Sequence, residues 1–452
     1  MTRRQLLLAA LAPKSTRPNI IMAMADDLGW GDVSFHGHKI LKTPHLDAMA
    51  AAGLRMDRFY AGAPVCSPTR GSCLTGRHPY RYGIFFANAD DGTTAPSKYS
   101  LPREEITIAE ALKPLGYRTA HMGKWHLGDF DGPKRSAPSD NGFDEYFSTV
   151  RKVRTLDPEG YFDNGKLLPG LKGDDSKILV DRALEFIRRA SAAGEPFLLV
   201  LWFHTPHVPV IADAEHRARF TQYSEKQQHY WGAITAMDEQ MGRLRAELRG
   251  LKIADNTMLW WASDNGPEGN EEDANNPGTA GPWRGRKRSL FEGGVRVPAM
   301  LEWPARVKAG RRTDAVCSTL DYFPTILDLV GVKPADPKRP IDGISLRPLI
   351  EERPFASSSA MRISMKERPT PVAFETMGDA RGSLHLALIE NRYKLITDLD
   401  EKADMLFDLA GDAAESTNLA PKMPVRVKAM RARLSAWRDS CRASNAGKDY
   451  GS

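Results

Sequence analysis

One cysteine stands at a predicted helix start, in the run Cys-Ser-Pro-Thr-Arg at residues 66–70, which Gly-Ser-Cys-Leu-Thr-Gly-Arg continues. Ser67 is a favourable N-cap and Pro68 suits the first helical position, so a short helix is predicted with Cys66 just before its first turn. Unpaired N–H groups and the helix dipole favour anions there. Arg70, about one turn on, can reach back to the same place. The pattern predicts a reactive cysteine at an anion site; a buried cysteine before a capped helix is the alternative.

Acidic residues follow two strand-like apolar runs. Asp26 and Asp27 come directly after Asn-Ile-Ile-Met-Ala-Met-Ala, and Asp264 and Asn265 follow the apolar run at residues 257–262. In an open parallel sheet both pairs fall at the carboxyl ends of strands, where ligands bind. Three carboxylates and one amide oxygen form an all-oxygen set, which suits Ca²⁺ or Mg²⁺ better than zinc. Each pair alone is explained by a cap or a turn, but together they predict a divalent cation site.

Four basic side chains stand near other predicted strand ends. Lys124 and His126 lie two residues apart in Gly-Lys-Trp-His-Leu-Gly, and on an extended segment they point to the same side. His207 follows an apolar strand in Thr-Pro-His-Val-Pro, and Lys287 lies at the far end of a long loop. Taken alone, each lysine is explained as a surface residue and each histidine as a capping or core residue. His204, which has no clear chemical role, is given that simpler interpretation. As a set they suit an anionic substrate.

The apolar segments alternate between strand and helix character, which implies a mostly parallel sheet covered on both faces. A Gly/Pro/Asn-rich loop at residues 265–288 is long enough to be functional. The expected strands are 19–25, 117–122, 197–203, 257–262 and 297–303, and the expected helices are 44–52, 107–115, 176–190, 224–248 and 319–330.

The sequence changes character after residue 350. Residues 351–371 carry proline, serine and mixed charge and are typical of a connector; strand-like runs at 383–390 and 392–397 and a helix at about 424–440 follow. We therefore predict three parts: an export segment at 1–17, a catalytic domain at 18–350, and a connector with a smaller C-terminal α+β subdomain at 351–452.

Composition limits the function classes. The 452 residues carry a net charge of +6 without a long Lys/Arg tract, which argues against a nucleic-acid partner. Four cysteines are too few and too scattered for a disulfide framework, so Cys73, Cys317 and Cys441 are expected to be buried apolar residues.

Arg3 and Arg4 precede a short apolar run that resembles a twin-arginine-like export signal, which favours a periplasmic or extracellular location over a cytoplasmic one. No apolar run is long enough to span a membrane.

Taken together, the motifs resemble the type I sulfatases, the formylglycine-dependent, Cys-type family of the alkaline phosphatase superfamily. The similarity runs from about residue 18 to about residue 420 and keeps the order of the family's motifs. It includes Asp-Asp-Leu-Gly-Trp-Gly-Asp, the cysteine run with Thr-Gly-Arg, Gly-Lys-Trp-His-Leu-Gly, Pro-His-x-Pro, Ser-Asp-Asn-Gly, Glu-Gly-Gly and the late Leu-Phe-Asp-Leu. The resemblance implies an α/β fold with a large mixed, mostly parallel sheet sandwiched by helices.

The resemblance also implies the ligands and the nucleophile. Asp26, Asp27, Asp264 and Asn265 would hold one Ca²⁺ or Mg²⁺ per chain. Cys66, converted to formylglycine by a maturation enzyme, would give its aldehyde hydrate as nucleophile and offer one hydroxyl to the cation.

The remaining roles follow from the same resemblance. Arg70 would orient the hydrate, and Lys124 and Lys287 would bind the sulfate oxygens. His207, with Lys287, would assist protonation of the departing alcohol, and His126 would act as base when sulfate is expelled.

The expected function is hydrolysis of a sulfate monoester, by an arylsulfatase-like enzyme acting on a sulfated small molecule or, in preference, a sulfated carbohydrate. Two alternatives stay open: a phosphate or phosphonate ester hydrolase of the same superfamily, and a non-catalytic protein that binds sulfated glycans. A family contact to sulfate after Gly-Phe-Asp cannot be placed, since Ser148, Arg151, Lys152 and Arg154 follow here. The arginines flanking Lys287, which are Arg284, Arg286 and Arg288, either meet a polyanionic substrate or are merely exposed.

Overall fold

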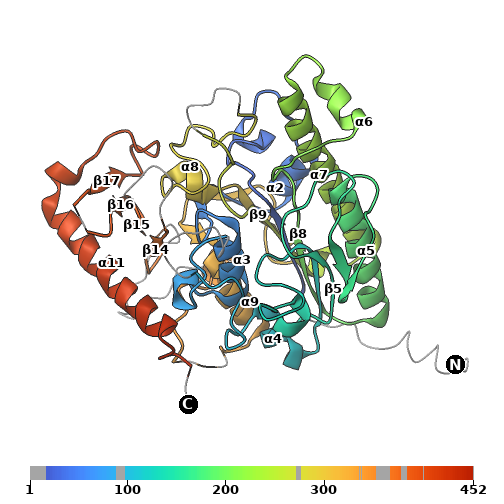
Figure 1. Cartoon of the computed structure of the whole chain (residues 1–452), viewed down its shortest axis with the longest axis horizontal. Coiled ribbons are helices and arrows are strands. Elements are labelled where there is room, and N and C mark those ends of the chain that lie inside the picture. Colours follow the sequence, from blue (N-terminus) through green and yellow to red (C-terminus); the bar gives the residue numbers. More distant parts are fainter. Residues whose placement is uncertain are drawn as a thin grey trace, which may run out of the picture.

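A large, mostly parallel sheet organises the chain (Figure 1). The computed structural model describes residues 17–87, 97–270, 276–334, 336, 338–352, 367–377, 384–400 and 402–450. In sheet order the described strands are β12 (Arg311–Thr313), β2 (Leu54–Met56), β11 (Ala299–Glu302), β9 (Thr257–Ser263), β1 (Asn19–Ala25), β8 (Phe197–Trp202), β4 (Arg118–Lys124), β5 (Glu145–Thr149), β6 (Tyr161–Asp163) and β7 (Lys166–Leu167).

The central strands β9, β1, β8, β4 and β5 are parallel to their neighbours, while β11 runs antiparallel to β9, and β6 antiparallel to β5. This mixed arrangement confirms the fold class expected from the alternation of strands and helices. The carboxyl ends of the five parallel strands therefore meet at one edge of the sheet.

Helices cover both faces of the sheet, which explains why every residue of β1, β8 and β9 is buried. Along β1, Ile20, Met22 and Met24 point into one core, and Ile21 and Ala23 point into the other. The first core is closed by α3 (Cys66–Thr75), α4 (Ile108–Leu112) and α9 (Tyr322–Val330), and the second by α2 (Pro44–Ala52), α5 (Asp175–Ala193) and α7 (Glu225–Gly250).

A smaller antiparallel sheet follows in the chain, where the strand-like runs after residue 371 predict a C-terminal α+β subdomain, and it lies at the left of the view in Figure 1. One face packs against Leu290, Val295 and Val316 of the larger part, and the other packs against Val427 and Leu434 of a long terminal helix. Its elements are β14 (Val372–Glu375), β15 (Leu386–Glu390), β16 (Tyr393–Thr397), β17 (Met405–Asp408) and α11 (Pro424–Asn445).

A three-stranded sheet joins distant segments of the larger part. It pairs β3 (Phe59–Tyr60) with β10 (Arg296–Val297) in antiparallel and with β13 (Cys317–Ser318) in parallel orientation. The shortest α-helices in the described part are α6 (Ala214–Arg217), α8 (Glu292–Val295) and α10 (Arg347–Ile350).

The strand expected at 297–303 is split into two, because Pro298 interrupts it between β10 and β11.

Several expectations concern residues outside the described part. Residues 1–16 of the expected export segment, 353–366 of the connector and 271–275 of the long loop are among them. The three-part division therefore stays a prediction. Among the described residues, no helix has both the length and the apolar composition that a membrane crossing requires.

Candidate active site

The two acidic pairs meet at the carboxyl edge of the sheet. Strands β1 and β9 are parallel neighbours in which Ala25 lies opposite Ser263, so the residues that follow them are brought together. The backbone N–H of Asp27 donates to Oδ1 of Asp264 at 3.0 Å. Asp27 has φ 65°, a left-handed conformation that aspartate tolerates better than most residues and that turns the chain sharply at the strand end.

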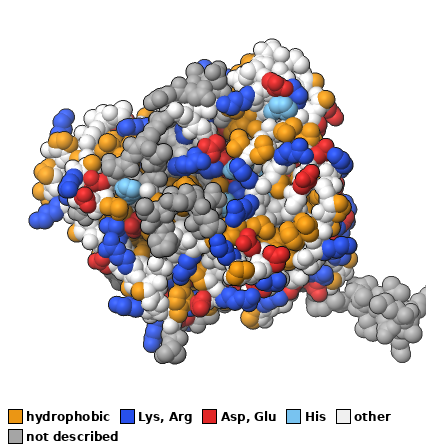
Figure 2. All heavy atoms as spheres, viewed as in Figure 1, with side chains coloured by type: hydrophobic (Ala, Val, Ile, Leu, Met, Phe, Trp, Pro, Cys, Tyr) orange, Lys and Arg blue, Asp and Glu red, His pale blue; other side chains and the backbone are white. Residues whose placement is uncertain are grey.

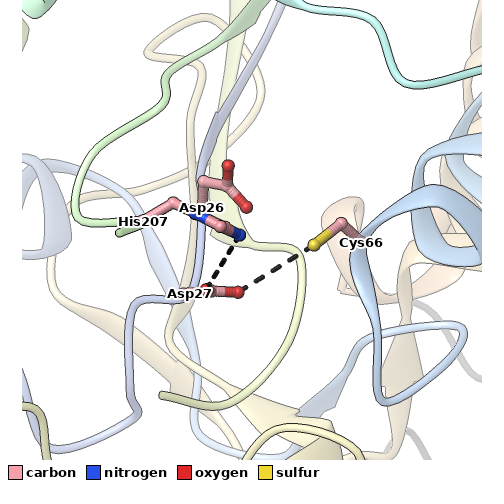
Figure 3. Close-up of side chains that lie close together, drawn as sticks. All are labelled: Asp26, Asp27, Cys66 and His207. Atoms are coloured by element: carbon pink, nitrogen blue, oxygen red, sulfur yellow. Dashed lines mark hydrogen bonds and ion pairs between the residues drawn. The ribbon is translucent and has the colours of Figure 1, made fainter. Parts of the chain in front are cut away.

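Cys66 faces these carboxylates from the start of α3. Its Sγ lies 4.0 Å from Oδ1 of Asp27, and Asp26, Asp27, Cys66 and His207 each offer a ligand atom within 4.8 Å of the others. Figure 3 shows these side chains converging from three separate segments. The expected capping differs, because Val65 is the N-cap and Cys66 is the first helical residue.

Ser67 does not cap the helix. Its hydroxyl donates to the backbone carbonyl of His126 at 2.6 Å, so it ties α3 to the segment after β4. This contact joins residues 59 positions apart in the chain, which is why the local N-cap pattern could not reveal it.

Arg70 links the two acidic pairs. Its Nη2 lies 2.6 Å from Oδ2 of Asp264 and 3.3 Å from Oδ1 of Asp26, and its Nη1 donates to the carbonyl of Lys124 at 3.1 Å. The side chain is fully buried. A charged guanidinium in the interior requires such partners, so Arg70 fixes the spacing between β1 and β9 at this edge.

Lys124 and His126 reach the same centre, though not by the expected geometry. Lys124 is the last residue of β4, and its Nζ donates to Oδ2 of Asp26 at 2.7 Å. His126 has φ 58°, so the segment is not extended and the argument that alternate side chains share a side is wrong here. Burial, and then the positive charges of Lys124 and Arg70, hold the pKa of His126 well below its usual value. Its Nδ1 is buried and has no hydrogen-bond partner among the described residues.

His207 and Lys287 complete the group. Nζ of Lys287 lies 2.7 Å from Oδ2 of Asp27 and 3.3 Å from Nε2 of His207. Nδ1 of His207 lies 2.6 Å from the carbonyl of Val208, which assigns the proton to Nδ1 and the lone pair to Nε2 in the neutral ring. Burial lowers the pKa of His207 to about 4, although Asp27 acts in the opposite sense. The ring is therefore neutral near pH 7.

The charged groups set each other's protonation. Burial opposes ionisation of Asp26, but the positive charges of Lys124 and Arg70 outweigh it and hold its pKa well below the usual value. Burial, and then the negative charge of Asp26, raises the pKa of Asp264. Burial also opposes protonation of Lys287, yet Asp27 holds its pKa well above the usual value.

The thiol of Cys66 is not activated in this setting. Burial raises its pKa to about 12, even though Lys124 and Lys287 act in the opposite sense. A thiol is nucleophilic as its thiolate, so at neutral pH this side chain is unreactive as cysteine.

The acidic group fits a hard cation by its chemistry. Oδ1 of Asn265 is buried without a hydrogen-bond partner among the described residues, while its Nδ2 donates to Asp27 at 2.7 Å. Buried oxygens of this kind are normally satisfied, so an unpaired amide oxygen beside a carboxylate indicates a ligand. Carboxylate and amide oxygens are the donors that Ca²⁺ and Mg²⁺ prefer.

The surrounding arginines have internal roles. Arg288 pairs with Glu268 at 2.6 Å, and Arg286 donates to the carbonyl of Glu268 at 2.8 Å. The guanidinium of Arg284 lies 3.9 Å from the ring centre of Phe291. All three therefore have partners within the protein, and Glu268 is a charged neighbour of Lys287 that the sequence analysis missed.

Other residues named in the sequence analysis lie outside the active-site centre. His204 lies in the core, between Asp175 at 2.9 Å and Thr149 at 2.7 Å, as expected. Ser148 is fully buried and bonds to His121 at 2.7 Å. The prediction that Cys73, Cys317 and Cys441 are buried without disulfides is confirmed.

Three buried carboxylates, three buried cations and a cysteine thus lie together at the carboxyl edge of a parallel sheet. Figure 2 shows one face of the molecule, on which Lys and Arg side chains are interspersed with acidic and apolar ones. The fold and this polar centre define an enzyme of the alkaline phosphatase superfamily.

Comparison with known proteins gives the family. The sulfatase family model matches residues 18–332, and a second, described as N-sulphoglucosamine sulphohydrolase, C-terminal, matches residues 283–440. N-acetylgalactosamine-6-sulfatase of Canis lupus familiaris is 33% identical over 360 residues, which are 75% of this chain and 67% of that protein. Arylsulfatase G of Rattus norvegicus is 32% identical over 378 residues, covering 74% and 68%.

A solved structure agrees with these relatives. The crystal structure of Ps i-CgsB in complex with k-i-k-neocarrahexaose is similar with a TM-score of 0.82 and 26% identity, over 94% of this chain and 93% of that one. The chain belongs to the sulfatase family. It is accordingly a sulfuric ester hydrolase.

Proposed function

We propose that this enzyme releases sulfate from a sulfated carbohydrate, using a formylglycine at position 66 and one divalent cation. The observation that carries the proposal is the convergence of Asp26, Asp27, Cys66 and His207, whose donor atoms lie within 4.8 Å of one another. Asp264 and Asn265 join them through the register of β1 and β9.

The cation would be held by Asp26, Asp27, Asp264 and Asn265. When bound, a Ca²⁺ or Mg²⁺ ion polarises a sulfate oxygen and lowers the pKa of a coordinated hydroxyl. The residues around it already balance the carboxylates, since Arg70 contacts Asp264 and the two lysines contact Asp26 and Asp27. Adding a divalent ion to this balanced set makes the centre positive, which favours an anionic ester.

The conversion of Cys66 explains why an unactivated thiol lies at the centre. A formylglycine hydrate at this position would supply one hydroxyl for attack on sulfur. Loss of the proton from its second hydroxyl would then re-form the aldehyde and break the C–O bond to the sulfate. The thiol itself, with a pKa of about 12, is a poor candidate for either role.

The remaining side chains have complementary tasks. Nζ of Lys124 and of Lys287 each lie 2.7 Å from a carboxylate of the centre, so both ammonium groups are placed to bind sulfate oxygens. Preorganised positive groups of this kind stabilise charge as it develops. Nζ of Lys287 lies 3.3 Å from Nε2 of His207, so the ammonium group is placed to give the departing alcohol a proton, directly or through that ring nitrogen. His126 is neutral with an unpartnered Nδ1, as a general base must be.

The carbohydrate class is supported by the similar proteins. One is an N-acetylgalactosamine-6-sulfatase, and another was crystallised with k-i-k-neocarrahexaose. The phosphate or phosphonate alternative is disfavoured by Asn265, because an amide at this position suits one hard cation better than a two-metal site with histidine ligands.

Mass spectrometry of the peptide that contains Cys66 tests the nucleophile. After coexpression with a formylglycine-generating enzyme, we expect a loss of about 18 Da at Cys66, and we expect Cys66→Ala to abolish turnover of nitrophenyl sulfate. Cys73→Ala serves as the control, since Cys73 is equally buried but lies outside the centre. A fully active preparation with an unmodified thiol at position 66 would overturn the proposal, and preferential turnover of nitrophenyl phosphate would favour the alternative.

We further propose that residues 1–17 direct export to the periplasm or outside the cell. Sequencing the amino terminus of the protein recovered from the periplasm tests this. Cleavage after the Ala-Leu-Ala run is expected, and an uncleaved cytoplasmic protein contradicts it.

A further inference from the structure

The loop that carries Lys287 ends at a fully buried acidic residue, Glu292, the first residue of α8. Its carboxylate accepts from the hydroxyl of Tyr60 at 2.9 Å and from Nη1 of Arg296 at 3.3 Å. It also accepts from Nζ of Lys394 at 3.0 Å. In Figure 1, α8 lies on the side of the large sheet that faces the C-terminal sheet.

Two of the residues around Glu292 come from the C-terminal part of the chain. Lys394 lies in β16, and its Nζ is 2.9 Å from Oε1 of Glu415. The other oxygen of Glu415 accepts the backbone N–H of Glu292 at 2.6 Å. Lys394, Glu292 and Glu415 have no exposed surface. We call Glu292, Lys394, Glu415, Tyr60 and Arg296 the Glu292 cluster.

Burying the Glu292 cluster removes several charges from water, which costs solvation free energy. Desolvating several charges offsets most of their mutual attraction, so such a group contributes little net stability and is better explained by the geometry it enforces. Glu415 adds to this cost with a φ of 57°, a left-handed conformation that is unfavourable for glutamate. The position of Glu292 is therefore fixed from the C-terminal side at a cost to the fold.

Backbone contacts of the Glu-Gly-Gly turn, residues 292–294, couple the position of Glu292 to the loop that carries Lys287. The N–H of Gly293 donates to the carbonyl of Arg284 at 2.6 Å. A Cβ added to Gly293 would lie 2.1 Å from the carbonyl oxygen of Gly285, and one added to Gly294 would lie 2.0 Å from that of Ser289. The loop backbone thus rests directly on the turn, and Lys287 lies on that backbone.

We propose that Lys394 and Glu415 are positioning residues for Lys287. They hold Glu292, the Glu-Gly-Gly turn holds residues 284–289, and that loop places the ammonium group of Lys287 beside Asp27 and His207. The C-terminal sheet thereby shapes the active site without contacting the substrate. The inference rests on the role proposed above for Lys287.

The first test is Lys394→Met, which keeps the length of the side chain and removes its charge. Two buried carboxylates then lose their shared cation and the Glu-Gly-Gly turn shifts. A displacement of about 1 Å in an active site can cost on the order of a hundredfold in rate. We expect kcat for nitrophenyl sulfate to fall at least about tenfold, with a smaller change in KM. Glu415→Gln, which keeps an acceptor for the Glu292 N–H, should lose less than Glu415→Ala.

Arg245→Met is the matched control. Arg245 forms a comparably buried pair with Glu302 at 2.6 Å, but Glu302 lies opposite Leu259 in β9, away from the carboxyl end where Asp264 stands. It should lower thermal stability without the loss in kcat. Hydrogen exchange of the full-length protein gives an independent reading, since the amides of Gly293 and Lys287 should exchange faster in Lys394→Met and not in Arg245→Met.

A double-mutant cycle with Lys287→Met decides the outcome. If Lys394 acts through Lys287, the kcat penalty of Lys394→Met disappears in the Lys287→Met background. Additive losses, or unchanged exchange in the loop, overturn the positioning role. A Lys287→Met enzyme with normal turnover instead overturns the proposed role of Lys287, so the two failures are distinct. If Lys394→Met does not fold, the Glu415→Gln and Glu415→Ala pair carries the same cycle.

Discussion

At the level of single residues, the centre combines groups that would be unstable apart. Asp26, Asp27 and Asp264 are matched in number by Arg70, Lys124 and Lys287, and each cation lies within 3.5 Å of a carboxylate. This neutral arrangement lets six charges be buried together. It also holds both lysines at the centre, so under the proposed function the same contacts would serve folding and substrate recognition.

Ser67 provides a residue-level prediction. Its hydroxyl supports the carbonyl of His126, which sits in a left-handed conformation. We expect Ser67→Ala to destabilise the protein by about 1 kcal/mol, because a buried carbonyl loses a hydrogen bond. We also expect kcat to fall roughly tenfold, because His126 loses its fixed position. Turnover should be normalised to the formylglycine content measured by mass spectrometry.

The control for this change is Ser72→Ala. Ser72 is buried in the same helix and donates to the carbonyl of Thr69 at 2.7 Å, so it should cost similar stability but leave kcat close to that of the wild type. Equal kcat in the two variants would show that Ser67 does not act through His126.

The residue types of the centre could be predicted from the sequence, but part of its geometry could not. Asp26 and Asp264 follow apolar strands directly, so their meeting is a consequence of sheet topology. The orientation of His126 depends on a positive φ and on Ser67, a contact between separate segments. No local pattern encodes such contacts.

At the level of elements, the site depends on loops that are packed backbone to backbone. The N–H of Gly266 donates to the carbonyl of Gly294 at 2.9 Å, which joins the segment after β9 to the Glu-Gly-Gly turn. Local apolar runs predicted several strands and helices, β1 and α2 with their observed bounds, but β5 was missed because its sequence, Glu-Tyr-Phe-Ser-Thr, is not a continuous apolar run. The contacts of Glu292 with Lys394 and Glu415 span more than a hundred residues and have no local signal.

Gly266→Ala tests the packing of these loops. A Cβ at this position would lie 1.9 Å from the carbonyl oxygen of Gly293, so the backbone must move. We expect a loss of roughly 2 kcal/mol in unfolding free energy, as for other overpacked sites, together with a loss of activity. Urea denaturation and turnover of nitrophenyl sulfate measure the two effects.

Gly250→Ala is the matched substitution, because a Cβ there meets nothing within 4 Å at the end of α7. It should be neutral or stabilise the protein slightly, by reducing the entropy of the unfolded chain. If Gly266→Ala behaves like Gly250→Ala, the two loops are not packed as described.

At the level of the whole molecule, α11 is joined to the larger part through buried polar contacts. His78 lies beside Trp437 with ring centres 4.6 Å apart, and Asp342 accepts from both Arg81 and Trp437. The C-terminal helix therefore shares its polar contacts with the segment that follows α3. Its stability should depend on the protonation of His78.

The pH dependence of stability follows from the direction in which the pKa of His78 is shifted. Burial lowers the pKa of His78 to about 3, so between about pH 6.5 and 3 the unfolded chain binds the proton and the folded chain does not. Stability is lost as the pH falls through this window, by at most about 1.4 kcal/mol per pH unit from this one group. His78→Asn keeps an acceptor for the N–H of Tyr80 and removes the titration. Urea denaturation from pH 7 to 4 should give a flatter profile for the variant, and parallel profiles would contradict the assignment.

The cation, finally, should link the centre to the stability of the whole chain. Because Asp26, Asp27, Asp264 and Asn265 come from the ends of β1 and β9, an ion bound to them stabilises only the folded protein. Linkage predicts a gain of about 2.7 kcal/mol at a hundred times the dissociation constant. Thermal unfolding after treatment with EDTA, and again with added Ca²⁺ or Mg²⁺, measures this gain.

Asp264→Asn separates a specific ion from a general salt effect. It removes one carboxylate charge, which is that of the nearer of the two carboxylates paired with Arg70, so the shift caused by the cation should shrink strongly while the starting stability also falls. Asp439→Asn is the control, since this exposed carboxylate pairs with Arg442 at 3.5 Å and its removal should leave the shift intact. If Ca²⁺ stabilises both variants equally, the ion acts elsewhere on the protein. A shift that is lost in Asp264→Asn and kept in Asp439→Asn instead means that the ion binds at the carboxyl edge of the sheet, where β1 and β9 end.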